Sequence, residues 1–412
     1  MKKKILIIGN GANAYALAKK LSEQHEIFIA PSSDTLKEFA TCLDIREDNI
    51  TELLEFVLEN GIDMTIPFSA ASMNSDIVSV FTSNRQQIFS PSLNNAKLVF
   101  NKAQTKKLFY KLRIPTPKFG IFEKQNVVND YLKNQKIPFV LKTNASNSAV
   151  IQTSILTAKN ILDSIYIDKN NKVIIEDYIY GTPFTFYSVT DGYKALPIGS
   201  SIIYRHSLEG DGGQLTSGMG AVCPNYKISY EQENFIMNDV IYPIMQYLES
   251  GDSPYMGILG VNGIITDEGS IIILGLNSFF QDCDAQTVLS LIDDDLYNIF
   301  EACIIGSFSD EYEIIKTSDN SSVSIVLTCK NKDVKSNVIS GLDKLDDSIS
   351  VSYFPNVSKN KYLEYEAPSG QVLVLSSIAS SAAKSRDILY SNVNLVKYSG
   401  MHYRRDICEC KL

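Results

Sequence analysis

The first thirty residues carry the pattern that most narrows the choice of fold. An apolar run reaching Ile8 ends at Gly9-Asn10-Gly11, apolar residues then recur at helical spacing from Ala12 to Leu21, and Ile27–Ala30 is a second short apolar run. Parallel strands need a long crossover connection, and the helix between these two strands provides one, so we expect the two strands to pair in parallel. The alternation continues to about residue 90, which predicts a doubly wound parallel sheet.

Later segments follow a different pattern. A helix is predicted from about Asn94 to Leu112, and Pro115 and Pro117 end it. Strand-like segments separated by Gly, Asn and Asp fill residues 138–201, which is typical of hairpins in an antiparallel, lid-like subdomain. The sequence then predicts a long helix at residues 229–248 and two strands at residues 257–265 and 270–276. A polar linker follows at residues 317–322, and the terminal unit after it ends in a helix near residues 379–389.

The chain is therefore expected to be an α/β protein of several domains, because 412 residues exceed one ordinary domain. We expect an N-terminal doubly wound parallel sheet, a lid, a central subdomain and a small C-terminal α+β domain. The predicted boundaries are 1–98, 99–190, 191–316 and 317–412.

Composition excludes several classes of function. Hydrophobic residues make up 44% of the chain and charged residues 21%, as in a soluble globular protein. A formal net charge of −9 argues against a nucleic-acid partner. No apolar run approaches the ~18 residues of a membrane span, so we expect no membrane association. The seven Cys are scattered, which favours a reducing cytoplasm, and with only three His the chain has little material for a zinc site. We expect a monomer or homodimer.

The stretch Asp211–Ala221 contains four glycines and two hydroxyl side chains. Glycine adopts backbone angles closed to other residues, so successive N–H groups of such a loop can converge on an anion, with Thr216 and Ser217 beside them. A flexible surface turn is the alternative. The loop is predicted to lie between a strand-like and a helix-like segment.

The turn Gly9-Asn10-Gly11 follows a strand and opens a helix, which is also the context of a dinucleotide fingerprint. A helix N-terminus with small residues holds any phosphate or carboxylate. The acid that would take a ribose, Asp34, lies in a Pro-Ser-Ser turn. An anion site, a tight structural turn and an NAD site all stay open at this point.

Two lysines and an acidic pair occur in a suggestive order. Lys102 lies in a predicted helix, Lys142 ends the apolar run 137–141, and Glu176-Asp177 ends a later strand. This is the layout of a nucleotide held between two sheets, with lysines neutralising phosphate oxygens and the backbone of residues 177–180 meeting the base. Each lysine alone is equally explained as a solvated side chain.

In this order the motifs resemble the ATP-grasp superfamily and, within it, the phosphoribosylamine-glycine ligase family. The resemblance covers essentially the whole chain. The family's strand-plus-GNGG opening matches residues 5–11, its DxGPNTGGMGA loop matches Asp211–Ala221 without a gap, its EFNxRFGDPETQ segment falls on Gly275–Gln286, and its closing FYRRDI is His402–Ile407.

The resemblance implies an ATP-grasp fold, ATP and Mg²⁺ as cofactors, and glycine and phosphoribosylamine or a related amine as substrates. It assigns Lys102 and Lys142 to the phosphates, and Glu176, Asp177 and Ile179 to the adenine. It gives the metal to Asn277 and catalytic roles to Asp211 and Asp282. Substrate binding is implied for Gly9, Gly11, Asn13, Thr216, Ser217, Gly218, Met219 and Gly220.

This sequence also departs from the family at several of these positions. The family's metal-bridging glutamate falls on Gly275 and the following arginine on Phe279. The phosphate-covering GLAAGKG loop is shortened to residues 145–150, Thr182-Pro183 replaces an acidic pair, and GGREHA is residues 11–16 here. Glycine provides no metal ligand and phenylalanine no charge, so weakened metal and ATP binding is expected.

Three functions follow from the resemblance and its departures. The first is phosphoribosylamine-glycine ligase, with Asp282 or Asp284 replacing the missing carboxylate. The second is a ligase for a different acid and amine, and the third is a catalytically silent relative that binds a ligand or a protein. An NAD-dependent oxidoreductase is the alternative outside the superfamily.

Overall fold

The N-terminal unit is a parallel sheet, as predicted. The computed structural model describes residues 2–143, 149–165, 167–168, 170–251, 253–330 and 337–409. The strands lie in the order β3-β2-β1-β4 and all pair in parallel, with Ile5, Leu6, Ile7 and Ile8 fully buried in the middle strand. The elements are β1 (Lys4–Ile8), α1 (Ala12–Ser22), β2 (Glu26–Ala30), β3 (Thr41–Cys42), α2 (Ile50–Asn60), β4 (Met64–Pro67), α3 (Ala70–Met73) and α4 (Ile77–Ser83).

Two details of this unit differ from the sequence expectation. The helix expected near residues 72–82 is two short helices, α3 and α4. Residues 87–89 meet the sheet through a single parallel bridge between Thr65 and Ile88 rather than as a full strand. The helix expected over residues 94–112 is also divided, into α5 (Leu93–Phe100) and α6 (Lys102–Leu112), because the side chain of Asn101 caps the amide of Gln104 and starts a new helix.

The lid is an antiparallel sheet with strand order β5-β8-β6-β7. Phe139, Leu141, Val173 and Ile175 are buried between it and two helices. The strands of residues 119–177 are antiparallel as expected, but the hairpin formed by β9 (Thr182–Asp191) and β10 (Ala195–Ile203), which was expected in the lid, belongs to the large sheet. Its elements are β5 (Phe119–Phe122), α7 (Gln125–Leu132), β6 (Phe139–Thr143), β7 (Ala149–Gln152), α8 (Ile155–Asp163) and β8 (Val173–Asp177).

A nine-stranded sheet connects the rest of the chain, with strands in the order β15-β14-β9-β10-β13-β16-β20-β17 and β21 added beside β16. All its pairs are antiparallel. Strands on both sides of residues 316–317 thus share one sheet. They are β9 (Thr182–Asp191), β10 (Ala195–Ile203), β13 (Gly220–Cys223), β14 (Met256–Ile265), β15 (Ile271–Asn277), β16 (Ser321–Cys329), β17 (Ile349–Tyr353), β20 (Gly370–Ala379) and β21 (Met401–His402).

Helices and short hairpins complete the molecule. The long helix expected over residues 229–248 is continuous but has a π-helical middle, formed by α9 (Tyr230–Phe235), η2 (Ile236–Ile241) and α10 (Tyr242–Glu249). The last helix begins three residues later than expected because β20 extends to Ala379. The other elements are β11 (His206–Leu208), η1 (Glu209–Asp211), β12 (Gly212–Leu215), α11 (Ala285–Val288), η3 (Leu289–Leu291), α12 (Leu296–Ile305), α13 (Phe308–Glu311), η4 (Leu342–Lys344), β18 (Ser358–Lys359), β19 (Tyr365–Glu366) and α14 (Ala382–Val393).

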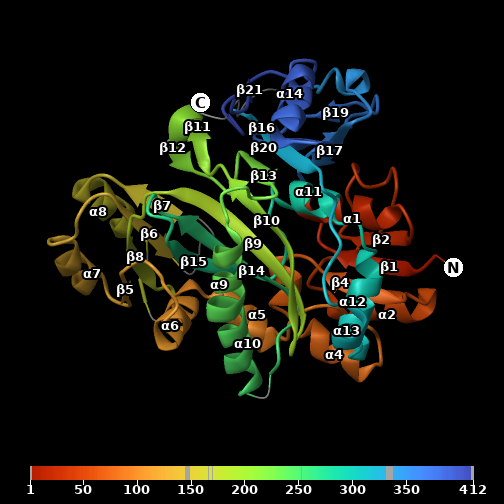
Figure 1. Cartoon of the computed structure of the whole chain (residues 1–412). Coiled ribbons are helices and arrows are strands. Elements are labelled where there is room, and N and C mark those ends of the chain that lie inside the picture. The colour runs from red at the N-terminus through yellow and green to blue at the C-terminus, as the bar shows by residue number, and fades with distance from the viewer. Residues whose placement is uncertain are drawn as a thin grey trace.

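Figure 1 shows how these units are arranged: the lid with β5–β8 lies at one side, the N-terminal sheet at the other, and the C-terminal elements above. The large sheet runs between them, and β7 of the lid packs against β12. Among the described residues, no helix is both long and apolar enough to cross a membrane.

Candidate functional site

Three lysines surround one buried glutamate where the lid meets α6. Lys142 on β6 donates to Glu176 Oε2 at 2.8 Å, and Lys106 Nζ lies 3.2 Å from Glu176 Oε1. Lys102, one helical turn before Lys106, donates to the carbonyl oxygen of Thr143, the residue after Lys142, at 3.4 Å. When all are ionised, these four side chains carry a net positive charge. This group brings together the predicted residues Lys102, Lys142 and Glu176.

Burial and mutual repulsion shift the pKa values of these groups. Burial, followed by the charge of Lys142, lowers the pKa of Lys102 to about 8. Burial also lowers the pKa of Lys106 to about 8, against the attraction of Glu176. Burial alone would raise the pKa of Glu176, but its ion pairs with Lys142 and Lys106 outweigh this effect and the pKa is lowered. The glutamate is therefore ionised and the lysines hold it in place.

Lys106 was not found from the sequence, although its spacing contained a signal. Lys102 and Lys106 are four residues apart, so they share one face of α6. The side chain of Lys106 is only 2% exposed and also donates to Thr116 Oγ1 at 2.6 Å. A fully buried lysine requires a charged partner, which here is Glu176.

The segment predicted to meet the adenine follows β8 directly. The backbone amide of Asp177 donates to the Lys118 carbonyl, while its carboxylate accepts from Gln135 Nε2 at 3.1 Å. Ile179 is half-buried, and the rings of Tyr178 and Tyr180 on either side of it meet edge to face. The side chains of Glu176 and Asp177 are engaged within the lid, and the contact of this segment with the adenine stays a prediction.

The glycine-rich stretch lies between strands rather than before a helix. It covers η1, β12 and β13, and β13 pairs with both β10 and β16. Thr216 donates twice to the Arg205 carbonyl, through its amide at 2.7 Å and its hydroxyl at 2.8 Å. The amide of Gly218 donates to Thr216 Oγ1 and that of Met219 to the Tyr204 carbonyl. The amides of Thr216, Gly218 and Met219 are thus paired within the chain, and the binding of an anion by this loop stays a prediction.

Close packing explains two of the glycines. At Gly218, where φ is +157°, an added Cβ would lie 2.3 Å from Cys283 Sγ. At Gly220 it would lie 2.6 Å from the Ser324 carbonyl oxygen. Both positions require glycine for close approach to a neighbouring segment. The stretch is consequently a tightly packed connection, and Ser217, whose hydroxyl accepts from Gln371 Nε2 at 3.0 Å, lies at its exposed turn.

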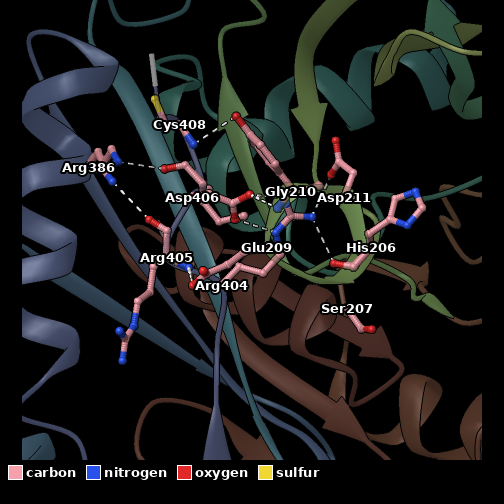
Figure 2. Close-up of polar contacts among 12 residues, drawn as sticks. His206, Ser207, Glu209, Gly210, Asp211, Arg386, Arg404, Arg405, Asp406 and Cys408 are labelled. Atoms are coloured by element: carbon pink, nitrogen blue, oxygen red, sulfur yellow. Dashed lines mark hydrogen bonds and ion pairs between the residues drawn. The ribbon is translucent and has the colours of Figure 1, made fainter. Parts of the chain in front are cut away.

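Asp211 is fixed by an arginine from the end of the chain. Arg404, whose side chain is 1% exposed, donates to Asp211 Oδ1 at 3.0 Å and to both carboxylate oxygens of Asp406, as Figure 2 shows. The amide of Gly210 donates to the same Asp406. Sequence reasoning missed this contact because 193 residues separate the two partners. The Asp211 side chain remains 65% exposed.

The N-terminus of α1 is occupied by the chain's own carboxylate. Asp282 accepts from the Asn13 amide at 2.8 Å, and the Asn13 side chain donates to the Phe280 carbonyl at 2.8 Å. Gln286 donates to the Ala12 carbonyl. Burial raises the pKa of Asp282 to about 6, although the Asn13 amide lowers it. The helix does hold an anion, as its turn indicated, but that anion is Asp282.

Neighbouring glycines shape this turn. At Gly9, with φ of +146°, a Cβ would lie 2.9 Å from the Phe68 carbonyl oxygen, and at Gly11 it would lie 2.4 Å from Asn13 Oδ1. Asp34, the acid considered for a ribose, accepts from Lys37 Nζ at 2.8 Å. The turn, Asp282 and the glycine-rich stretch meet in space, because Gly218 packs against Cys283 beside Asp282.

Asn277 pairs with a second asparagine. Asn262 on β14 and Asn277 on β15 exchange two hydrogen bonds between their amide groups, of 3.1 and 3.0 Å. Asn262 Oδ1 also accepts from the Arg205 guanidinium at 3.1 Å. Gly275 is the cross-strand partner of Asn262, and nothing lies within 4 Å of the position of its missing Cβ.

These residues do not fit a magnesium ion. Mg²⁺ prefers carboxylate oxygens and retained waters, whereas the oxygens here are neutral amides already paired and next to a guanidinium. Asp282 is engaged at α1, and Asp284 Oδ2 accepts from Thr185 and Tyr187, so neither replaces the missing carboxylate in this arrangement. Within the described ranges, no cluster of three or more His, Cys, Asp or Glu could hold a metal.

The position of the family's arginine is apolar as well. Phe279 packs against Phe68, with ring centroids 5.5 Å apart, and against Phe100, 6.1 Å away. Phe68 follows β4, and Phe100 ends α5. This end of the site is therefore closed by aromatic packing between the N-terminal unit and the large sheet. The phosphate-covering residues 145–148 lie outside the described residues.

Two family models match the chain. The phosphoribosylglycinamide synthetase N domain matches residues 3–98, and the phosphoribosylglycinamide synthetase ATP-grasp (A) domain matches residues 100–285. Together the two matches cover well over half of the chain. A phosphoribosylamine--glycine ligase from Caldanaerobacter subterraneus is 26% identical over 418 residues, covering 98% of this chain and 99% of the relative.

Solved structures show the same fold. The phosphoribosylamine--glycine ligase of Thermotoga maritima superposes with a TM-score of 0.81 at 19% identity, over 98% of this chain and all of the other. The biotin carboxylase domain of a Hydrogenobacter thermophilus 2-oxoglutarate carboxylase, solved with ADP, magnesium and bicarbonate, gives 0.71 at 14% identity, over 98% and 92% of the two chains. These likenesses confirm an ATP-grasp architecture.

Proposed function

The chain belongs to the phosphoribosylglycinamide synthetase family, and from this premise we propose that it is an ATP-dependent carboxylate–amine ligase that joins glycine to phosphoribosylamine. The observation that carries the proposal is the group of Lys102, Lys106 and Lys142 around Glu176, which supplies positive charge where the lid meets the ATP-grasp core. In this proposal the enzyme acts in the cytoplasm as a monomer or homodimer.

Lys102 and Lys142 bind the phosphate oxygens of ATP in this proposal, and Lys106 positions Glu176, which in turn orients Lys142. The backbone near Ile179 binds the adenine. The γ-phosphoryl group moves to the glycine carboxylate and gives ADP and an acyl phosphate. The amine nitrogen then attacks the acyl carbon, and phosphate leaves as the amide bond forms.

Asp211 and Asp282 flank the substrate side. Asp211 is exposed at the start of the glycine-rich stretch, where its charge attracts the ammonium group of glycine. Asp282, with a pKa raised to about 6, is ionised at neutral pH and accepts the proton that the attacking amine loses. The turn at Gly9–Asn13 lies next to this carboxylate and binds the amine substrate.

The test is ADP release measured with glycine, phosphoribosylamine and ATP together and with each omitted in turn. We expect turnover only in the complete mixture, and Lys142→Ala should abolish it while Lys107→Ala, on the exposed side of the same helix as Lys106, retains it. Turnover with a different acid and amine would show that the chain is a ligase with other substrates.

A second function is favoured by the replaced residues Gly275 and Phe279. A silent relative that binds nucleotide without turning it over fits a site with no carboxylate at the metal position and no charge at Phe279. Calorimetry with ATP separates the two functions: binding without ADP release under any substrate mixture establishes the silent relative. Absence of nucleotide binding rejects both.

A further inference from the structure

Arg205 contacts Asn262, the cross-strand partner of Gly275, and the family resemblance places a glutamate at the position of Gly275. Residue 205 follows β10, and its carbonyl is fixed by both Thr216 bonds. Its guanidinium reaches across β9 to Asn262 Oδ1 on β14 at 3.1 Å and to the Ser217 carbonyl at 3.5 Å. The arginine therefore connects the glycine-rich stretch to the pair formed by Asn262 and Asn277.

No acid in the described part of the chain forms an ion pair with this charge, although Asp284 lies near enough for Arg205 to lower its pKa against the effect of burial. Among the described residues, no carboxylate lies within ion-pair distance, 4.0 Å, of the Arg205 guanidinium. A guanidinium has five N–H donors, and the two hydrogen bonds to Asn262 and Ser217 are to uncharged oxygens. A partly buried arginine in this setting favours an anionic ligand, because planar donors match phosphate and carboxylate oxygens.

Space for such a ligand exists beside it. Asn262, Gly275 and Thr185 are cross-strand neighbours on one line across the sheet. Gly275 contributes no side chain to this line, and no atom lies within 4 Å of the position of its missing Cβ. Asn277 lies two residues further along β15 on the same face as Gly275. The open position is thus bordered by two amide groups and approached by one guanidinium.

We propose that Arg205 supplies the positive charge that a divalent metal supplies in a site with carboxylate ligands, so that the phosphate tail of a nucleotide binds at Arg205 and Gly275 without a metal. This inference rests on the nucleotide binding of the proposed function. The lysines at Glu176 contact the tail from the lid, and Arg205 contacts it from the sheet. The ligand class is a nucleoside di- or triphosphate free of Mg²⁺.

The test is isothermal calorimetry of ADP binding to the full chain, in EDTA and in excess Mg²⁺. We expect affinities equal within about threefold in the two buffers. Arg205→Gln should weaken ADP binding about tenfold or more in EDTA and leave adenosine binding unchanged, because adenosine has no phosphate. The matched control is Arg46→Gln, which changes an arginine whose side chain is 81% exposed.

Each outcome decides a separate point. ADP binding that requires Mg²⁺ overturns this inference and leaves the proposed function standing. Metal-independent binding that Arg205→Gln does not weaken overturns the role of Arg205. Absence of ADP binding in both buffers overturns the proposed function together with the inference.

A gain-of-function variant provides an independent measurement. Gly275→Glu combined with Arg205→Gln places a carboxylate in the open position and removes the competing charge. We expect ADP affinity in this double variant to rise about tenfold on adding Mg²⁺, unlike in the parent chain. An equal response of both proteins to Mg²⁺ contradicts the inference, and circular dichroism checks that the variant is folded.

Discussion

Glu176 and Asp284 are both buried carboxyl groups, but their pKa values shift in opposite directions. Lys142 and Lys106 hold the pKa of Glu176 below its usual range despite burial. Burial raises the pKa of Asp284 to about 7, against hydrogen bonds from Thr185 and Tyr187. The lid region therefore keeps an ionised acid among lysines, whereas Asp284, at the start of α11, has a pKa near neutral pH.

This difference separates the binding of phosphate from the binding of metal. The lysine group retains the charges that a nucleotide requires, while the sheet around Gly275 retains amides and one guanidinium. The two sets of residues lie on different elements, the lysines and Glu176 on α6, β6 and β8 and the amides on β14 and β15. A substitution in one set therefore leaves the contacts within the other set in place.

The largest effect on stability is expected from removing one of the lysines that contact Glu176. Lys106→Ala leaves Glu176 buried with one lysine fewer and should lower the free energy of unfolding by about 3–5 kcal/mol. Chemical denaturation measures it, and exposed Lys107→Ala on the same helix should change it by less than about 0.5 kcal/mol. Equal effects of the two substitutions would show that the buried ion pair does not stabilise the lid.

The raised pKa of Asp284 should make the free energy of unfolding fall as the pH rises. A folded-state pKa of about 7, above the ordinary value of 3.8, gives a stability contribution that is present at low pH and is lost as the pH rises through 7. Asp284→Asn removes this titration. Its free energy of unfolding should gain about 3 kcal/mol relative to the parent between pH 5 and pH 8. A pH-independent difference would contradict the raised pKa.

The lysine side should also titrate, and here the measured quantity is ligand affinity. Lys102 has a pKa of about 8 and is protonated below that value, so ADP binding should be strongest below pH 8. We expect affinity to fall about tenfold between pH 7 and pH 9. Lys102→Met should flatten this profile. A profile unchanged by the substitution would exclude Lys102 from phosphate binding.

The smallest effect tests whether the asparagine pair binds metal. Asn277→Ala removes two amide hydrogen bonds and should cost about 1 kcal/mol of stability. Calorimetric titration with Mg²⁺ and ADP should give the same result for the variant and the parent. Loss of a magnesium response on substitution would identify Asn277 as a ligand after all.

The architecture was largely predictable because its signals are local. The apolar run at residues 5–8 and the turn at Gly9–Gly11 indicate a parallel unit, and it is present. The hairpin across Asp191-Gly192 also pairs as expected. Breaks such as the one at Asn101 were missed, since one side chain capping a new helix outweighs the continuous apolar pattern around it.

The sequence predicted the grouping of charged residues in the candidate site, because lysine side chains are expected where phosphate is bound. Lys102, Lys142 and Glu176 lie together, as their order indicated. The glycine-rich stretch is followed by a strand rather than the expected helix, and its amides and glycines meet residues outside the stretch, the carbonyls of Tyr204 and Arg205 and the atoms of Cys283 and Ser324. Arg404 gave no local signal for its contact with Asp211.

Asn262 did give a signal that sequence reasoning did not use. It is the one polar side chain within the apolar strand Met256–Ile265, and its partners are Asn277 and Arg205. A polar residue inside an apolar strand requires a hydrogen-bond partner. Which partner it takes depends on strand order and register, which are properties of the folded sheet.

In the proposed mode of binding, the side chains of this protein alone hold the nucleotide phosphates. The most direct test is a crystal structure of the chain grown with ADP and EDTA. We expect the diphosphate between Lys142 and Arg205, with the adenine against the backbone near Ile179. A diphosphate that is ordered only when Mg²⁺ is added and bound at Asn277, or ADP bound elsewhere, would contradict it.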